Sequence, residues 1–294
     1  MNILITGGSG FIGQHLTRKL SRKNKIFILD KKIKRNSRNV KYIKGDVRKF
    51  KSFSKIKKID KIYHLAAQTS SEVSETKSIL DLNTNIIGSY NVCKFAIEKK
   101  VKELIFSSSM AVYGANKLKT SENTVCKPVS NYGISKLCAE KLVEKLKYYK
   151  IKYKIFRIYN AYGPLQDLKN LKQGMISIYL SQILKNNKVE IKGSIKRYRD
   201  FIYIEDLINI MLNKKLKVNN IYNIGTGKKT YVFEVIKIIE KITNKKIKII
   251  NKNNTKGDVF GSQADVSKIK KFINPVFKTK VYDGIKKTIK SITK

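Results

Sequence analysis

Two side chains that could exchange protons, Tyr132 and Lys136, stand four residues apart. Residues at this spacing share one face of a helix, so the phenol and the ammonium are expected side by side. A tyrosine with an ordinary pKa of about 10 is a poor base, but a neighbouring positive charge favours its phenolate form. The pair therefore indicates acid–base chemistry, although a solvent-facing tyrosine and lysine on any helix would show the same pattern.

A phosphate-binding turn is indicated at the start of the chain. An apolar run with β-branched residues, 3–5, meets Gly7, Gly10 and Gly13, and an amphipathic segment follows. This order predicts a strand, a tight turn and a helix. Glycines at such positions permit a positive φ and a close approach of the backbone to a pyrophosphate, which the N–H groups of the helix N-terminus then bind.

An acidic residue strengthens this interpretation. A second apolar run, 26–29, ends at Asp30, about 20 residues beyond the central glycine, where dinucleotide-binding folds place the carboxylate that holds the adenosine ribose. The alternative is a glycine turn that only connects a strand to a helix. The strand, the helix and Asp30 together favour a dinucleotide site.

The elements that must position these residues alternate between strand and helix. Further strands are predicted at 40–44, 59–65, 103–106 and 153–158, and long helices at 79–99 and 131–148. This order predicts a Rossmann-like, doubly wound parallel α/β sheet with its ligands at the carboxyl ends of the strands. The pattern loosens after residue 164. We expect a dinucleotide-binding domain of residues 1–159 and 201–226, interleaved with a smaller α/β substrate lobe of residues 160–200 and 227–294.

Composition excludes several other classes. No run of about 18 apolar residues is present, so no membrane span is expected, and the first strand begins almost at Met1, which leaves no room for a signal peptide. Three cysteines without a C-x-x-C pair and only two histidines argue against a disulfide framework, a metal site and a histidine-based triad. A cytoplasmic protein without a bound metal is expected.

The formal net charge of +43 comes mainly from lysine, which supplies 56 of the 64 basic residues. The lysines are spread along the whole chain, whereas a nucleic-acid surface would favour clustered basic residues with interleaved aromatics. We therefore expect no specific nucleic-acid partner, although non-specific binding of polyanions at low salt is compatible with this charge.

Taken together, the motifs resemble the extended short-chain dehydrogenase/reductase family, and within it the nucleotide-sugar epimerases of the UDP-glucose 4-epimerase type. The resemblance covers essentially the whole chain. It rests on segments 6–13, 45–47, 64–67, 107–109, 112–114, Tyr132 with Lys136, Asn160, 162–164, 199–201, 222–227 and 257–258.

The resemblance implies NAD as the cofactor, a UDP-sugar as the favoured substrate, and roles for individual residues. The implied cofactor contacts are Gly7, Gly10, Phe11, Ile12, Gly13, Asp30, Asp46, Val47, Leu65, Ala66, Ala67, Asn85, Ser107, Tyr132, Lys136 and Tyr159. The implied catalytic residues are Ser109, Tyr132 and Lys136, and the implied substrate contacts are Ser109, Tyr132, Asn160, Arg199, Lys256, Asp258 and Ser262. The family often has an arginine where this chain has Thr255, so Lys256 would supply the charge without a bidentate fork.

The implied reaction is redox-neutral. Tyr132 would take the proton from the sugar O4 while a hydride leaves C4 for NAD, Ser109 would hydrogen-bond O4, and Lys136 would hold the nicotinamide ribose and lower the pKa of Tyr132. The 4-keto sugar would turn over in the pocket and receive the hydride on its opposite face, so no second substrate is needed.

Related reactions stay open at this point. Dehydratases and decarboxylases of the family carry an acidic residue directly after the catalytic Ser or Thr, whereas Met110 and Ala111 follow Ser109 here. A 3,5-epimerase/reductase would need a cysteine and a histidine near the sugar, and Cys126 and Cys138 are at unmatched positions. A 4-reductase and a non-enzymatic, polyanion-binding relative are further alternatives, but the latter would not need a complete Ser–Tyr–Lys set.

Two finer expectations also follow from the resemblance. The small Ser262, four residues after Asp258, would leave room for an N-acetyl group on the sugar, unless the loop is displaced by a residue or Phe260 fills the gap. The helices at 79–99 and 131–148 resemble a pair that forms a homodimer interface in this family, although their apolar stripes could also face only the parent sheet.

Overall fold

A computed structural model describes residues 1–115, 119–253, 259–273 and 277–292. Its centre is a seven-stranded parallel sheet in the order β11-β6-β5-β4-β1-β2-β3. The strands are β1 (Asn2–Thr6), β2 (Lys25–Asp30), β3 (Val40–Lys44), β4 (Lys61–His64), β5 (Glu103–Ser109), β6 (Lys152–Ile158) and β11 (Asn220–Ile224). The strand order reverses between β1 and β4, which is where doubly wound sheets bind their ligands. The predicted fold class is confirmed.

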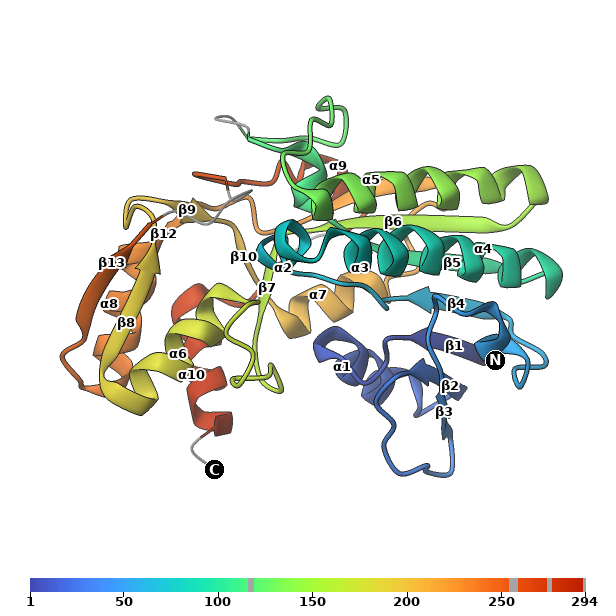
Figure 1. Cartoon of the computed structure of the whole chain (residues 1–294), viewed down its shortest axis with the longest axis horizontal. Helices are drawn as coiled ribbons and strands as arrows, with labels where there is room; N and C mark the ends of the chain where they lie inside the picture. The colour runs from blue at the N-terminus through green and yellow to red at the C-terminus, as the bar shows by residue number, and fades with distance from the viewer. Residues whose placement is uncertain (116–118, 254–258, 274–276, 293–294) are drawn as a thin grey trace.

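Helices cover both faces of this sheet, because alternate residues of each buried strand point to opposite sides. In β1, Ile3 and Ile5 join the core beneath α1 (Phe11–Leu20) and α7 (Ile204–Met211), whereas Leu4 joins the core beneath α4 (Gly88–Glu98) and α5 (Asn131–Glu144). Figure 1 shows α4 and α5 running side by side along the sheet. The first turn of α5 thereby lies beside the carboxyl end of β5.

Two predicted helices differ in detail. The segment 79–99 is α3 (Ser78–Leu82), a π-helical turn η2 (Asn83–Ile87) and α4 in succession, preceded by an unpredicted helix α2 (Ser71–Thr76). The second predicted helix ends as α5 at Glu144 and continues only as a 3₁₀ turn, η4 (Lys145–Tyr149), before Lys150 takes a left-handed conformation. Single π turns frequently occur at functional sites, and this one turns Asn85 inward.

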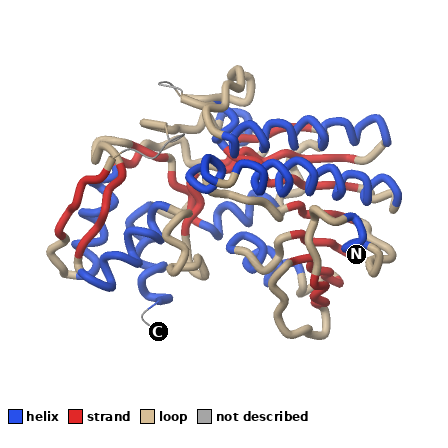
Figure 2. Tube along the Cα trace, viewed as in Figure 1, coloured by secondary structure: helices blue, strands red, loops and turns tan. Residues whose placement is uncertain are grey.

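The remaining elements lie mostly beside the sheet (Figure 2). A pair of parallel strands, β8 (Lys188–Lys192) and β13 (Lys248–Lys252), accompanies α6 (Met175–Asn186), α8 (Val232–Thr243) and α10 (Val281–Ile292). Two short strand pairs join this part to the main sheet: β7 (Asn160–Tyr162) with β10 (Phe201–Tyr203), and β9 (Tyr198–Arg199) with β12 (Thr230–Tyr231). Short helical elements complete the chain: η1 (Phe50–Phe53), η3 (Met110–Tyr113) and α9 (Ser267–Lys270). Among the described residues, no helix is both long and apolar enough to span a bilayer.

Candidate active site

A cleft of about 650 Å³ runs along the carboxyl ends of the central strands, across the point where the strand order reverses. Most of the residues singled out from the sequence meet there. Those that line it are Gly7, Gly10, Phe11, Ile12, Gly13, Asp30, Asp46, Val47, Leu65, Ala66, Ala67, Ser107, Ser109, Tyr132, Lys136, Tyr159, Asn160 and Arg199.

The glycine turn after β1 is packed too tightly for side chains. Gly7 has a φ of +72°, and a Cβ added to it would lie 2.7 Å from the backbone nitrogen of Ala66. A Cβ on Gly13 would lie 2.6 Å from the carbonyl oxygen of Gly7. Helix α1 begins directly after Gly10, so its first N–H groups and its positive dipole end face the cleft. This cradle of backbone suits the diphosphate of a dinucleotide.

Two carboxylates lie next to this cradle at the ends of β2 and β3. Asp30 accepts hydrogen bonds from the backbone nitrogens of Ser9, at 2.9 Å, and Lys32, at 3.0 Å. Burial works to raise the pKa of Asp46, but hydrogen bonds from Arg48 outweigh it and lower that pKa to about 2. Asp30 lines the cleft at the end of β2, where its carboxylate can accept hydrogen bonds from the hydroxyl groups of an adenosine ribose.

The three expected catalytic residues converge from two elements. Ser109 ends β5, while Tyr132 and Lys136 occupy successive turns of α5. Ser130 caps the N-terminus of this helix, because its side chain accepts a hydrogen bond from the backbone nitrogen of Gly133 at 3.1 Å. Lys136 Nζ donates to the carbonyl oxygen of Ser107 at 2.5 Å and lies 4.3 Å from the centre of the Phe106 ring.

Burial dominates the electrostatics of this group. It raises the pKa of Tyr132 to about 12, with the Ser109 hydroxyl acting in the opposite direction and Asp81 adding to the increase. It lowers the pKa of Lys136 to about 7, against the opposing influence of Glu140 and Asp81. Burial of the phenol has the largest effect on the pKa of Tyr132 in the chain by itself, and the lowering of that pKa by Lys136 stays a prediction for the enzyme with its cofactor.

Asn85 and Ser262 are not among the residues that line the main cleft. Asn85, only 1% exposed, lies outside the cleft and donates from Nδ2 to Asp81, Gln68 and Ser135, because the π turn points its side chain under α5. The predicted contact of Asn85 with the cofactor stays a prediction. Ser262 lines a separate small cavity of about 10 Å³, which shares Met110 and Tyr159 with the main cleft.

Lys256 and Asp258 lie outside the described residues. Tyr159 borders the cleft as expected, and its hydroxyl is hydrogen-bonded to the Thr120 hydroxyl.

Sequence reasoning missed the far wall of the cleft. Residues between β7 and α6 contribute Gln166, Asp167, Asn170 and Gln173 to its lining. These residues belong to a connecting segment with no periodic pattern, so only their polar character could have drawn attention to them.

Comparison with known proteins agrees with this geometry. A family model described as the NAD dependent epimerase/dehydratase family matches residues 3–225. The chain is 34% identical over 276 residues to a Methanocaldococcus jannaschii protein named "Putative UDP-glucose 4-epimerase", and the match covers 90% of each chain. It is also 32% identical over 275 residues to a dTDP-D-glucose 4,6-dehydratase of Dictyostelium discoideum, covering 82% of this chain and 61% of the relative.

The fold is shared more closely than the sequence. The crystal structure of a UDP-glucose 4-epimerase from Thermotoga maritima with UDP-glucose superimposes with a TM-score of 0.93 and 32% identity, over 100% of this chain and 99% of that one. A doubly wound sheet with a dinucleotide cradle and a Ser–Tyr–Lys group defines an NAD-dependent enzyme of the short-chain dehydrogenase/reductase type. The chain belongs to the NAD-dependent epimerase/dehydratase family, and NAD is its cofactor.

Proposed function

We propose that this protein is a 4-epimerase of UDP-hexoses that acts through a transient 4-keto sugar. The observation that carries the proposal is the convergence of Ser109, Tyr132 and Lys136 on one cleft, next to residues that cannot move protons at a second carbon. Met110 and Ala111 line the cleft directly after Ser109, and neither carries an ionisable group. The relatives named as UDP-glucose 4-epimerases support this choice.

The chain's own residues hold the cofactor and move the proton. The glycine turn and the N-terminus of α1 bind the diphosphate, Asp30 binds the adenosine ribose, and Lys136 binds the nicotinamide ribose. When bound, NAD supplies hydride acceptance and return at the sugar C4, together with a positive charge that favours the tyrosine phenolate. That charge offsets the effect of burial on the pKa of Tyr132.

Proton transfer is assigned to Tyr132. Its phenolate takes the proton from the O4 hydroxyl as C4 becomes a carbonyl and returns it when C4 is reduced again. Ser109, at the end of β5 beside it, donates a hydrogen bond to O4 and keeps this oxygen oriented. Because C4 is oxidised and reduced within one turnover, the products contain the same atoms as the substrate.

The nucleotide diphosphate is assigned to Asn160 and Arg199, at the boundary between the two predicted domains. Arg199 is 3% exposed, lines the cleft, and donates from Nη1 and Nη2 to the carbonyl oxygens of Phe260, at 3.1 Å, and Val259, at 2.8 Å. These contacts orient its guanidinium plane. We assign residues 160–200 and 227–294 to the sugar-nucleotide lobe and residues 1–159 and 201–226 to the NAD domain.

The N-acetylated substrates UDP-GlcNAc and UDP-GalNAc are included in the proposal because of Ser262. Its Oγ is buried without a hydrogen-bond partner among the described residues, in a cavity that adjoins Met110 and Tyr159 of the main cleft. A buried hydroxyl without a partner favours a polar ligand group, such as the amide of an N-acetyl sugar.

The second candidate is a 4,6-dehydratase, favoured by the Dictyostelium relative. Dehydration needs an acid and a base that act at C5 and C6, beyond the reach of the C4 chemistry. The position where dehydratases of this family are expected to carry that acid holds Met110, so we assign the dehydratase reaction a lower rank.

The proposal is tested by incubating the purified enzyme with UDP-glucose, UDP-galactose and their N-acetylated forms, and by identifying the products by ¹H NMR. We expect interconversion within each pair without added cofactor. Tyr132→Phe should lower kcat by at least about 100-fold, the usual scale of general acid–base catalysis, while NAD stays bound. Tyr148→Phe, an exposed tyrosine of the adjoining turn η4, is the matched control and should leave kcat unchanged. A 4-keto-6-deoxy product would replace the epimerase assignment with the dehydratase one.

A further inference from the structure

A third residue of α5 continues the face that carries Tyr132 and Lys136. Glu140 lies one turn beyond Lys136 and is completely buried. Its Oε1 accepts a hydrogen bond of 2.5 Å from the Ser108 hydroxyl, while Lys136 Nζ donates to the carbonyl oxygen of the neighbouring Ser107. Two successive turns of the helix are thus bonded to two successive residues at the end of β5, directly before Ser109.

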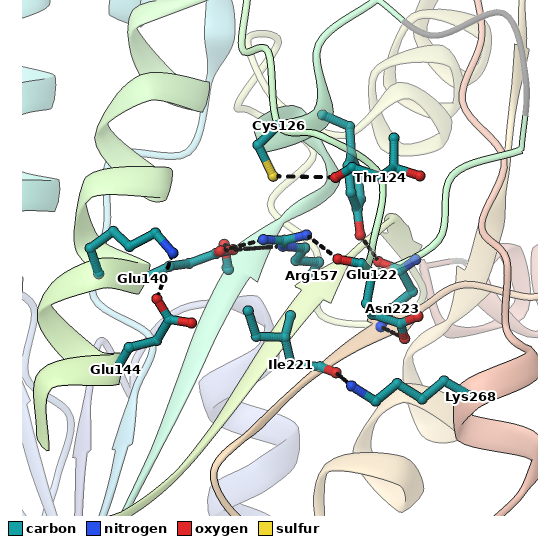
Figure 3. A network of polar contacts seen from close by, with 12 residues as sticks. Glu122, Thr124, Cys126, Glu140, Glu144, Arg157, Ile221, Asn223 and Lys268 are labelled. Carbon is teal, nitrogen blue, oxygen red and sulfur yellow. Dashed lines mark hydrogen bonds and ion pairs between the residues drawn. The ribbon is translucent and has the colours of Figure 1, made fainter. Parts of the chain in front are cut away.

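An arginine on the adjacent strand anchors this contact. Arg157 of β6 is the register partner of Ser108, is 4% exposed, and donates to Glu140 from Nε at 3.0 Å and from Nη2 at 2.7 Å. Figure 3 shows Arg157 between Glu140 on one side and Glu122 on the other. The network therefore ties α5, β5 and β6 together immediately beside the catalytic residues, and it reaches the cleft at Ser108.

Glu140 also belongs to the charged groups around Lys136. The ammonium faces Glu140 from its own helix, Asp81 from α3 and His64 from β4, with Tyr132 one turn away. Within the described part of the chain, Lys136 donates to the carbonyl oxygen of Ser107 and to neither carboxylate. Burial alone disfavours an ammonium, so these two negative charges are what opposes its deprotonation.

We propose that Glu140 is a positioning residue of the reaction: it sets the catalytic face of α5 against the Ser107–Ser109 end of β5. The inference rests on the proposed roles of Tyr132 and Lys136. A purely structural role for the buried ion pair is the alternative, and it predicts that any replacement that restores stability also restores turnover.

The test removes the ion pair without leaving a lone buried charge. Glu140→Gln alone would strand Arg157, which is expected to destabilise the protein strongly. The double variant E140L/R157M replaces both charges with apolar groups of similar size, an exchange that buried ion pairs often tolerate without loss of stability. Glu144→Gln is the matched control, because Glu144 lies on the same helix and, among the described residues, forms its ion pair with the exposed Lys141.

The expected result separates stability from turnover. E140L/R157M should unfold at a urea concentration near that of the parent protein and bind NAD with reduced affinity. Its kcat should fall at least about 10-fold, since misplaced catalytic groups lose rate steeply, and the alkaline limb of its pH–rate profile should move to lower pH. The direction follows because Lys136 must stay protonated, and without Glu140 it loses its proton at lower pH. Glu144→Gln should match the parent in all four measurements.

A second variant keeps the test informative whether or not the pair variant folds. Ser108→Ala leaves the Glu140–Arg157 pair intact and removes the hydroxyl that bonds Glu140 at the edge of the cleft, so kcat should fall about 3- to 10-fold at unchanged KM. Native kcat in Ser108→Ala, or native kcat and an unshifted pH profile in E140L/R157M, would overturn the inference. Tyr132→Phe, measured alongside, separates a failure of the proposed function from a failure of the role of Glu140. If Tyr132→Phe keeps native turnover, the proposed function fails. If Tyr132→Phe is inactive while the Glu140 and Ser108 variants are fully active, only the role of Glu140 fails.

Discussion

Gly13 of the phosphate cradle offers a direct test of how closely NAD must approach the backbone. A Cβ at this position would lie 2.6 Å from both the carbonyl oxygen of Gly7 and the Cα of Gly8, whereas ordinary contacts begin at 3.4 Å. These atoms belong to the backbone of the turn itself, so Gly13→Ala must separate the turn from α1 by about 0.8 Å.

The energetic consequences differ for folding and for binding. Overpacking costs about 1–3 kcal/mol, but alanine regains about 1 kcal/mol inside a helix, so the free energy of unfolding should fall by no more than about 2 kcal/mol. A displacement of this size stretches an N–H···O hydrogen bond from about 2.9 Å to beyond its limit. Each charge-assisted hydrogen bond to the diphosphate is worth about 1.5–3 kcal/mol, so NAD affinity should fall at least about 10-fold.

Calorimetric titration of the cofactor-stripped variants with NAD, together with urea unfolding, measures both quantities. Gly10→Ala is the matched control for folding, because its Cβ would meet only the Gly7 oxygen, at 3.2 Å, and the unfolding midpoint should stay near that of the parent. A Gly13→Ala protein that binds NAD with parental affinity would refute the assignment of this turn to the diphosphate.

Three further predictions concern the cofactor, the assembly and the substrate range. The cofactor released from the denatured enzyme should be NAD without NADP, because Asp30 repels a 2′-phosphate and Lys31 lies 3.4 Å from Asp46. Asp30→Asn should allow NADP to bind, and an unchanged preference for NAD would show that Asp30 does not select the cofactor. Sedimentation at micromolar concentration should show a homodimer, because Ile79 and Tyr90 are 68% and 52% exposed on the helices predicted to pair. Tyr90→Glu should shift the protein to monomer, whereas the control Ile33→Glu on a distant loop should not. A monomeric parent protein would contradict the predicted homodimer. Ser262→Tyr should depress turnover of the N-acetylated pair selectively, and an equal loss for both pairs would show that Ser262 does not border the sugar.

Much of the site could be predicted because its signals are local. The glycine turn, Asp30 and the Tyr132–Lys136 pair are each defined by spacing within one strand–turn–helix unit or one helix. Residues of this kind reach the cleft wherever the sheet is doubly wound, since its carboxyl edge gathers them. Ser109 also lines the cleft, at the end of its strand, whereas its catalytic role came from the family resemblance and stays a prediction.

Other features depend on tertiary packing and leave no local signal. The raised pKa of Tyr132 results from its burial, which no spacing encodes. The inward turn of Asn85 depends on one extra residue in the π turn, and the bond between Glu140 and Arg157 joins residues on two separate elements. An isolated glutamate and an isolated arginine in a chain with 64 basic residues could not be recognised as partners before the fold was known.

The central claim, hydride removal and return at a single carbon, is tested most directly by running the reaction in D₂O. UDP-galactose incubated with the enzyme should form UDP-glucose whose C4 and C5 hydrogens are both retained as protium in the ¹H NMR spectrum, because hydride does not exchange with solvent and no carbon acid is deprotonated. Deuterium at C4 would indicate deprotonation of that carbon, and deuterium at C5 with loss of the 6-hydroxyl would indicate a dehydratase. Either result would contradict redox-neutral 4-epimerisation.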